Sequence, residues 1–406
     1  MPKLAQDLLP IINHKLDAVV PSDIRRFDKY VSQFDDVVKL TLGEPDLNTP
    51  EHIKQAAIRD IENNDSHYGP QSGKPELLQA IGKYVKGVTG VDYDPASEIT
   101  VTVGATEALN CSLSALLNDG DKVIVPTPVW SMYMQLVCLT GATPVEVDTS
   151  DTGFILTPEK LEEVIEREGK GVKAVMLNDP TNPTGVTYPK EVIEGLAEVI
   201  KKHHMYAISD EIYSELIYGD AKHYSLATYI PDRTIFISGL SKSHAMTGWR
   251  LGYICGPDEI MASVRKMNDF MITVVTNNVQ AAAIEALTNG LDDPKEFRDI
   301  YQRRVNFMEK GLKKLGFDMA LPRGAFYIFA KIPEKYQGDD VGFAKALAKD
   351  ARVGVIPGSY FGAGGAGYVR MSYASSDEVL KEALKRITKV CGSRIIIFIN
   401  LNFPLL

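Results

Sequence analysis

The sequence contains few cysteines, no surplus of basic residues and no long apolar run. Its 406 residues include four cysteines, none of them in a CxxC pair, at positions Cys111, Cys138, Cys255 and Cys391. This scattered spacing gives no sign of a disulfide framework, so we expect a reducing, cytoplasmic setting. A chain of this length is predicted to form two or three domains.

The charge balance is acidic. Lys and Arg number 44 against 53 Asp and Glu, which gives a formal net charge of -9. This argues against a general nucleic-acid binder, although a local positive site for a small anionic cofactor is compatible with it. No stretch approaches the roughly 18 apolar residues of a membrane span. The first residues lack the pattern of a signal peptide, and the apolar tail after Arg394 is interpreted as a strand or a buried end.

Apolar β-rich runs alternate with amphipathic helical patterns from about residue 98 onward. We expect strands at residues 98–103, 122–126, 144–148, 174–179, 205–210, 234–240 and 251–256. This alternation predicts right-handed βαβ crossovers and a mainly parallel sheet with helices on both faces. After about residue 290 a charged helix precedes short strands, which indicates a smaller α+β domain.

Polar residues follow several of the expected strands. Ligands of open parallel sheets bind outside the carboxyl ends of the strands, so these residues should meet at one rim. Gly104 to Thr106 follow a strand and open a helix, whose free N–H groups could bind an anion or simply be capped by Thr106. Asn182 lies in an NPTG turn, where it could bond its own backbone.

Four charged residues lie at the ends of apolar strands or near them. Asp210 needs a partner, either a protonated ring nitrogen or a structural group. Lys242 can lose its proton more readily at a buried strand end, as a Schiff-base amine must. Arg250 and Arg370 suit a phosphate or a carboxylate, and a protein carboxylate is the alternative partner of each.

Taken in order, these motifs resemble the signature of the class I/II pyridoxal-phosphate-dependent aminotransferases of fold type I. NPTG, SDEIY, SK followed by MTGWRLG, and YVRMSYA occur in the family order. The intervals also fit, with 28 residues from Asn182 to Asp210, 32 to Lys242, 8 to Arg250 and 120 to Arg370. Within this family the chain resembles the bacterial subgroup of aromatic, aspartate and N-acetyl-diaminopimelate aminotransferases.

The resemblance implies an aspartate-aminotransferase-like α/β fold. A large pyridoxal-phosphate-binding domain, with a mainly parallel sheet between helices, would comprise residues 45–290. A smaller α+β domain would comprise residues 1–44 and 291–406. The resemblance also implies a homodimer with shared active sites, in which Tyr68 reaches the phosphate group of the neighbouring subunit.

The resemblance further implies roles for individual residues. Lys242 would be the Schiff-base lysine of pyridoxal 5'-phosphate, and Asp210 would pair with the ring nitrogen. The predicted catalytic set is Lys242, Asp210 and Tyr213. The predicted cofactor contacts also include Tyr68, Gly104, Ala105, Thr106, Trp130, Asn182, Tyr213, Ser241 and Arg250. The substrate carboxylate is assigned to Gly43, Asn182 and Arg370.

One position departs from the family pattern, and one segment matches the motif of a different kind of site. Many relatives have a serine or asparagine where this chain has Gly239, so Ser238 and Ser241 are the candidates to supply that hydroxyl. Residues 362–367 match GxGxxG but precede a strand instead of opening a helix, so a nicotinamide site is not expected. No metal site is expected either.

The leading prediction is an aminotransferase that moves an amino group between an L-amino acid and a 2-oxo acid such as 2-oxoglutarate. No second arginine can be placed at a distal carboxylate, which favours aromatic or broad specificity and leaves aspartate and N-acetyl-diaminopimelate open. A pyridoxal-phosphate β-lyase of the cystathionine β-lyase type is the alternative. A non-enzymatic regulator is a remote one, which the acidic charge disfavours.

Overall fold

The computed structural model describes residues 2–8 and 13–391. Its main feature is a seven-stranded sheet with the order β2-β8-β7-β6-β5-β3-β4. Its strands are β2 Ile99–Thr102, β3 Lys122–Thr127, β4 Thr143–Asp148, β5 Val172–Asn178, β6 Tyr206–Asp210, β7 Thr234–Gly239 and β8 Gly252–Cys255. All seven coincide with predicted strands. The predicted apolar tail after Arg394 lies outside the described residues.

Strand β8 is the exception to the parallel arrangement of this sheet. It runs antiparallel to both β2 and β7, whereas β3 to β7 pair in parallel. A parallel return would need a crossover, usually through a helix. The connection at residues 240–251 contains only the short 3-10 helix Thr247–Trp249, so the chain turns back at the rim. This connection carries Lys242 and Arg250.

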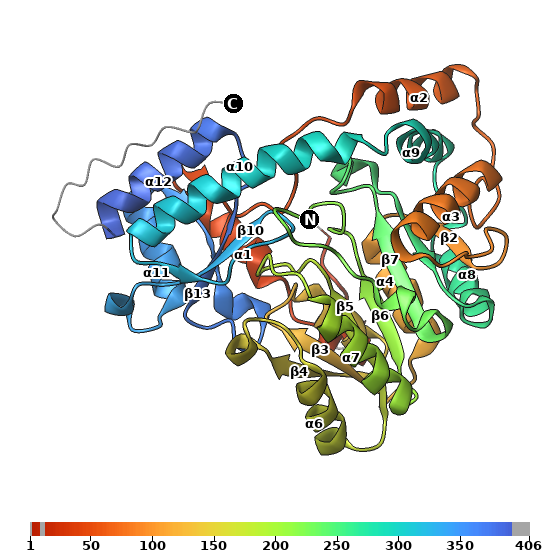
Figure 1. Ribbon diagram of the computed structural model, residues 1–406, viewed down its shortest axis with the longest axis horizontal. Helices are drawn as coiled ribbons and strands as arrows, with labels where there is room; N and C mark the ends of the chain where they lie inside the picture. Colours follow the sequence, from red (N-terminus) through yellow and green to blue (C-terminus); the bar gives the residue numbers. More distant parts are fainter. Residues whose placement is uncertain (1, 9–12, 392–406) are drawn as a thin grey trace.

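Helices cover both faces of the sheet (Figure 1). Alternate strand residues enter different apolar clusters: Ala174 and Met176 of β5 lie in one, and Val175 and Leu177 in another. The first cluster is completed by α4 Ala105–Leu116, α5 Met132–Leu139 and α8 Asp258–Ile272, and the second by α6 Pro158–Glu168 and α7 Lys190–Lys202. Near β2 the sheet is covered by α2 Glu51–Glu62, α3 Pro75–Thr89 and α9 Asn277–Asn289.

A second sheet has four antiparallel strands, in the order β12 Ile356–Pro357, β13 Tyr368–Ser372, β10 Tyr327–Lys331 and β9 Asp318–Met319. Around it lie α1 Asp23–Val31, α10 Asp293–Lys314, α11 Asp340–Ala346 and α12 Asp377–Cys391. Helix α12 faces the core with residues spaced three and four apart, Leu380, Ala383, Leu384 and Ile387. A short parallel pair joins β1 Val38–Lys39 to β11 Val353–Gly354.

The two sheets share a packed boundary. The apolar cluster of the smaller sheet includes Phe27 and Val31 of α1, and it also takes in Ile212 and Tyr213, which follow β6. The division into residues 45–290 and the two chain ends stays a prediction, which the separate smaller sheet supports. The boundary brings N-terminal residues close to the rim of the large sheet.

The remaining helical turns are short. The 3-10 turns are Gln6–Leu8, His14–Ala18, Ser150–Thr152, Leu226–Thr228, Pro231–Arg233, Glu334–Tyr336 and Gly358–Phe361, and a π-helical turn, Leu347–Ala351, continues α11. Within the described ranges, no helix combines the length and the apolar character needed to cross a membrane.

Candidate active site

A cavity of about 400 Å³ lies at the carboxyl ends of β5 and β6. This volume is in the range of small-molecule sites. Its walls come from α1, residues 41–43, the start of α4, the strand ends, the connection 241–250, and two side chains of the smaller sheet, Tyr327 and Arg370. The cavity therefore draws on both sheets and on segments far apart in the sequence.

One end of the cavity is suited to an anion. Gly104 is the N-cap of the twelve-residue helix α4, so the free N–H groups of its first turn face the cavity beside Ala105 and Thr106. Gly104 has φ 78°, and a Cβ there would clash with the guanidinium of Arg250. Arg250 lines the same end and donates to the Thr247 carbonyl at 3.0 Å. The N-terminus of α4 and the guanidinium of Arg250 together favour the binding of a phosphate group at this end.

Asp210 is a buried carboxylate without a cationic partner. Its Oδ2 accepts from the Tyr133 hydroxyl at 2.6 Å, and its Oδ1 accepts from the Ile212 backbone N–H at 3.2 Å. Burial raises the pKa of Asp210 to about 6 although these bonds oppose the shift. No described Lys, Arg or His forms an ion pair with it. A cation in the cavity would stabilise its charged form.

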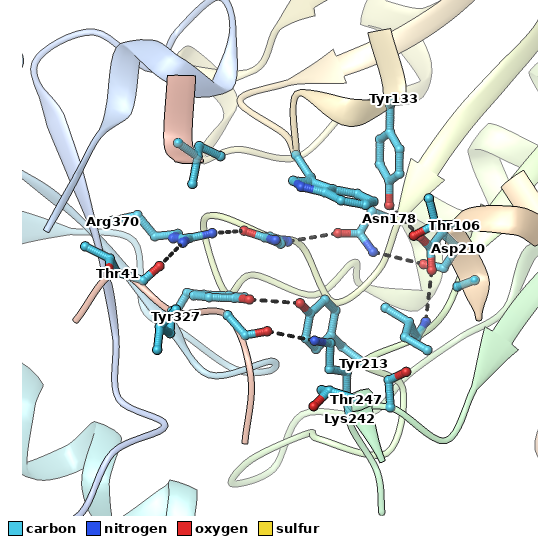
Figure 2. Close-up of a pocket in the computed structure, with 18 of the residues that line it drawn as sticks. Thr41, Thr106, Tyr133, Asn178, Asp210, Tyr213, Lys242, Thr247, Tyr327 and Arg370 are labelled. Carbon is cyan, nitrogen blue, oxygen red and sulfur yellow. Dashed lines mark hydrogen bonds between the residues drawn. The ribbon is translucent and has the colours of Figure 1, made fainter. Parts of the chain in front are cut away.

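Lys242 reaches into the cavity from the connection after β7. Its Nζ donates to the Gly43 carbonyl at 2.7 Å and lies 5.8 Å from the ring centre of Tyr213 (Figure 2). Burial lowers the pKa of Lys242 to about 8, Glu44 opposes this shift, and Arg250 adds to it. The amine therefore reaches its neutral, nucleophilic form at a much lower pH than an ordinary lysine does.

Arg370 is a buried guanidinium without an acidic partner. Its Nη1 donates to Asn182 Oδ1 at 2.9 Å and its Nη2 to the Thr41 carbonyl at 2.7 Å. The guanidinium lies between the rings of Tyr327 and Phe361, at 4.6 and 5.0 Å from their centres. Among the described residues, its Nε has no hydrogen-bond partner and no Asp or Glu pairs with it. The structural carboxylate that the sequence left open is thus absent from the described chain.

Hydrogen bonds connect the Arg370 guanidinium to the backbone of Asp210 (Figure 2). From Arg370 the chain passes to Asn182 Oδ1, from the Asn182 backbone N–H to Asn178 Oδ1 at 2.9 Å, and from Asn178 Nδ2 to the Asp210 carbonyl at 3.1 Å. This chain fixes the position of the guanidinium relative to the segment that carries the carboxylate.

Two aromatic side chains complete the walls. Trp130 lines the cavity and meets the ring of Tyr133 edge-on, with centroids 5.7 Å apart. The Tyr213 hydroxyl lies 2.9 Å from that of Tyr327, and burial raises the pKa of Tyr213, so this hydroxyl keeps its proton. Trp130 is placed to contact a flat ring, and Tyr213 can donate to an oxygen on one.

The structure brings most of the predicted site residues together. The cavity is lined by Gly43, Ala105, Thr106, Trp130, Asn182, Asp210, Tyr213, Ser241, Lys242, Arg250 and Arg370, and Gly104 lies beside it. Tyr68 is not among them, because its side chain is 87% exposed and outside the cavity. The assigned roles stay predictions.

Gly239 leaves no room for the serine or asparagine of many relatives. A Cβ at this position would lie 2.6 Å from the Leu251 carbonyl oxygen and 2.9 Å from the Cα of Gly252. Ser238 donates to the Glu211 carbonyl at 3.3 Å and does not line the cavity, whereas Ser241 does. Of the two candidate serines, only Ser241 is placed to contact a ligand.

Sequence reasoning missed several residues that line the cavity, namely Ile24, Arg25, Asp28, Thr41, Tyr133 and Tyr327. Tyr133 lies one helical turn after Trp130, so it carried a local signal. Arg25 and its neighbours on α1 carried none, because only the packing of the N-terminal helix against the boundary brings them to the site.

Comparisons with known proteins agree with this geometry. A family model described as aminotransferase class I and II matches residues 35–387. The chain is 41% identical over 377 residues to a probable N-acetyl-LL-diaminopimelate aminotransferase of Bacillus subtilis, covering 93% of this chain and 95% of that protein. It is 35% identical over 384 residues to the aromatic-amino-acid aminotransferase 2 of Thermococcus litoralis, covering 93% and 98% of the two chains.

A solved structure gives the same result for the fold. The aspartate aminotransferase of Thermus thermophilus with maleate matches with a TM-score of 0.88 at 37% identity, covering 93% of this chain and 99% of that chain. The predicted aspartate-aminotransferase-like α/β fold is thereby confirmed.

The unpaired charge of Asp210 gives a prediction for stability. The folded chain holds the Asp210 proton more tightly than the unfolded chain, with a pKa of about 6 instead of 3.8, so ionisation opposes folding above pH 6. Asp210→Asn should therefore raise the free energy of unfolding of the cofactor-free protein by about 1–3 kcal/mol above that pH. The gain should fade as the pH falls toward 4.

Chemical denaturation at several pH values measures this effect. Asp220→Asn is the control, because its carboxylate is exposed and forms only a surface ion pair with Arg323. A loss of stability in Asp210→Asn at high pH would contradict the assignment of an unpaired buried charge.

Proposed function

The chain belongs to the aminotransferase class I and II family, as its motifs predicted, and on this premise we propose that it binds pyridoxal 5'-phosphate in the described cavity. There it transfers an amino group between an L-amino acid and a 2-oxo acid such as 2-oxoglutarate. One observation carries the proposal: a single cavity holds a half-buried lysine, a buried carboxylate that pairs with no described cation and a buried guanidinium that pairs with no described anion.

The residues present fit the cofactor. Asp210 would hold the protonated ring nitrogen, which supplies the cation that the buried carboxylate lacks. The start of α4 and Arg250, with Thr106 and Ser241, would hold the phosphate. Tyr213 and Asn182 would contact the phenolic oxygen, with Trp130 against the ring. When bound, pyridoxal 5'-phosphate supplies an aldehyde that bonds to amines and a ring that accepts electrons.

Lys242 is the residue that moves the proton at the substrate α-carbon. Its pKa of about 8 makes the amine a base near the operating pH, which is where general acid–base catalysis is efficient. Arg370 holds the substrate carboxylate, because no Asp or Glu in the described part of the chain pairs with its guanidinium. Fixing the carboxylate at one end orients the α-carbon toward Lys242.

The same residues would serve a β-lyase of the cystathionine type. The relatives reported above are named as aminotransferases, which favours amino transfer over that alternative and over a non-enzymatic regulator. A direct assay separates the three.

The finer part of the proposal concerns the substrate side chain. Arg25 of α1 lines the cavity and forms no ion pair with another described residue. Its neighbour Asp28 is already paired, accepting from Thr41 Oγ1 at 2.5 Å and from Lys39 Nζ at 3.3 Å. Arg25 is therefore the available cation for a distal carboxylate, while Ile24 offers an apolar surface. We propose a broad range that includes both acidic and aromatic amino acids.

The homodimer is also part of the proposal. Tyr68 and Phe270 are 87% and 83% exposed, and Gln71 Nε2 donates to Asp269 Oδ1 at 2.8 Å, which ties their two segments together. Contiguous exposed apolar surface is typical of protein interfaces, and two large exposed aromatic side chains in neighbouring segments support one here. A second copy of the chain would cover them and would bring Tyr68 to the partner's phosphate site.

Lys242→Ala should lower amino transfer from glutamate to an aromatic 2-oxo acid by about 10²–10⁴-fold, because no other described lysine reaches the cavity. It should also abolish the visible absorbance of lysine-bound cofactor. Product chromatography and absorbance spectra measure the two effects. Lys310→Ala, an exposed position on α10, is the control. The proposal fails if Lys242→Ala keeps wild-type turnover, or if the wild type only cleaves cystathionine to pyruvate.

Arg25→Gln should reduce kcat/KM for aspartate and glutamate about tenfold more than for phenylalanine, because only the acidic substrates lose a charge-assisted hydrogen bond. Steady-state kinetics on both substrate classes measures the ratio. Arg26→Gln is a matched control, since Arg26 pairs with Asp23 and lies outside the cavity lining. An equal loss for both substrate classes would contradict the role of Arg25.

Tyr68→Phe should weaken cofactor retention, because the partner's phosphate site loses a hydrogen-bond donor. Phe270→Glu should shift the protein toward monomers that lose cofactor on gel filtration. Sedimentation analysis and bound-cofactor absorbance check both effects, and Leu321→Glu, an exposed apolar position, is the control. A fully active monomer that retains its cofactor would refute shared sites.

A further inference from the structure

A buried ionic cluster lies behind the cavity and does not line it. Its centre is His223, whose side chain is 7% exposed. The Nδ1 of this ring lies 3.1 Å from Asp179 Oδ2, and the Nε2 lies 2.6 Å from Glu211 Oε2. The side chains of Asp179 and Glu211 are 4% and 0% exposed. Three titratable groups are thus buried together next to the site without touching its cavity.

The geometry requires a charged ring. Ionised carboxylates only accept hydrogen bonds, so both nitrogens of His223 must donate, which the neutral imidazole cannot do. Although burial lowers the pKa of His223, Glu211 and Asp179 raise it to about 10. The imidazolium is therefore present across the physiological range, and the cluster carries one net negative charge.

The other oxygens of the cluster are also satisfied. Glu211 Oε1 accepts from Ser209 Oγ at 2.8 Å and from Ser225 Oγ at 2.6 Å. Asp179 Oδ1 accepts from the Tyr188 backbone N–H at 3.2 Å. A buried polar network is stabilising when every member has a partner, and it fixes the segments that supply its members.

The two carboxylates belong to the two turns that frame the site. Asp179 directly follows Asn178 and opens the turn that contains Asn182, whereas Glu211 directly follows Asp210. The backbone N–H of Asp179 also donates to the Asp210 carbonyl at 3.2 Å. His223 comes from a third segment, after β6, and bridges the two turns from behind.

The charge of the cluster also acts on the site. Glu211 is the neighbour of Asp210 and raises its pKa by repulsion between like charges. The imidazolium offsets one of the two negative charges of the cluster. Without it, two buried carboxylates would lie beside Asp210 with no cation between them.

We propose that His223 is a positioning residue for the cofactor: its imidazolium joins the turn of Asn182 to the turn of Asp210 and Tyr213, and it balances Glu211 so that Asp210 can carry the charge that holds the ring nitrogen. The inference rests on the proposed function, since it assigns a support to the same cofactor contacts.

The test uses a charge-balanced pair of variants. His223→Gln removes the cation and leaves Asp179 and Glu211 facing each other across a neutral amide. His223→Gln combined with Glu211→Gln restores one net negative charge. The new amide at position 211 can still accept from Ser209 and Ser225 and donate to position 223, which in turn donates to Asp179.

Cofactor affinity and folding stability are measured separately. Pyridoxal 5'-phosphate is titrated into cofactor-free protein and followed by intrinsic fluorescence, and the melting temperature of the cofactor-free form is recorded. His223→Gln should weaken cofactor binding by about 10–100-fold. This is the loss of affinity that is typical of metal sites when a residue that orients the metal ligands is replaced. The double variant should recover most of the wild-type affinity.

His52→Gln is the matched control. His52 also bridges two carboxylates, at 2.9 Å from Glu285 Oε1 and 2.9 Å from Asp293 Oδ2, and none of the three lines the cavity. Its loss should lower the melting temperature and leave cofactor affinity unchanged. A merely structural role of His223 would give the same result as His52→Gln.

The outcomes separate cleanly. Unchanged affinity in His223→Gln overturns the inference, and so does a double variant that folds but binds as weakly as the single one. If His223→Gln alone does not fold, the double variant decides: recovery of the wild-type affinity supports the inference, and weak binding overturns it. If the wild-type protein itself does not bind the cofactor, the proposed function is contradicted, and this result is distinct from every outcome that concerns the His223 variants.

Discussion

The site depends on the burial of two charges that have no opposite charge within the described protein, the carboxylate of Asp210 and the guanidinium of Arg370. Burying an unpaired charge is costly, so the rest of the fold must supply the free energy and the hydrogen bonds that keep both groups in place. The chain of bonds through Asn182 and Asn178 ties the guanidinium to the backbone of Asp210. A ligand that brings a cation to one end and a carboxylate to the other would relieve both costs, which is why this arrangement selects a protonated ring together with an amino acid.

The topology of the large sheet makes this arrangement possible. Because β8 returns antiparallel after β7, one short connection places both Lys242 and Arg250 at the rim, where they line the same cavity as Asp210 and the start of α4. The connection and its flanking strands pack so closely that a Cβ at Gly104 would clash with Arg250, and a Cβ at Gly239 would clash with the backbone of residues 251 and 252. The close packing of β2, β7 and β8 therefore also fixes where the charged side chains of the cavity lie.

Local patterns predicted the seven strands of the large sheet, because each strand is an apolar run bounded by polar residues. About half of the residues that line the cavity were predicted, several of them, such as Gly43 and Trp130, only through the resemblance of the ordered motifs to the aminotransferase family. The orientation of β8 was not predicted, since an apolar run does not reveal the direction of its neighbours. Arg25 and His223 were not predicted either. Each reaches its place only through the packing of segments distant in the sequence, α1 at the boundary and the chain after β6 behind the rim. The position of Tyr68 in a dimer stays a prediction, because a single chain leaves that side chain exposed.

Paired and unpaired buried charges are distributed differently around the site. Arg304 donates to both oxygens of Asp46 at 2.7 and 3.0 Å and to Asp377 at 3.1 Å, and so anchors the end of the segment whose Thr41 and Gly43 carbonyls accept from Arg370 and Lys242. His223 holds the turns after β5 and β6 in the same way. Both cations lie outside the cavity and are fully paired, whereas Asp210 and Arg370 line it and are not. A buried ion pair adds little net stability but resists the loss of either partner. Paired charges are therefore found in the segments around the cavity, where they keep the geometry fixed. Unpaired charges line the cavity itself, because a bound ligand supplies their partner.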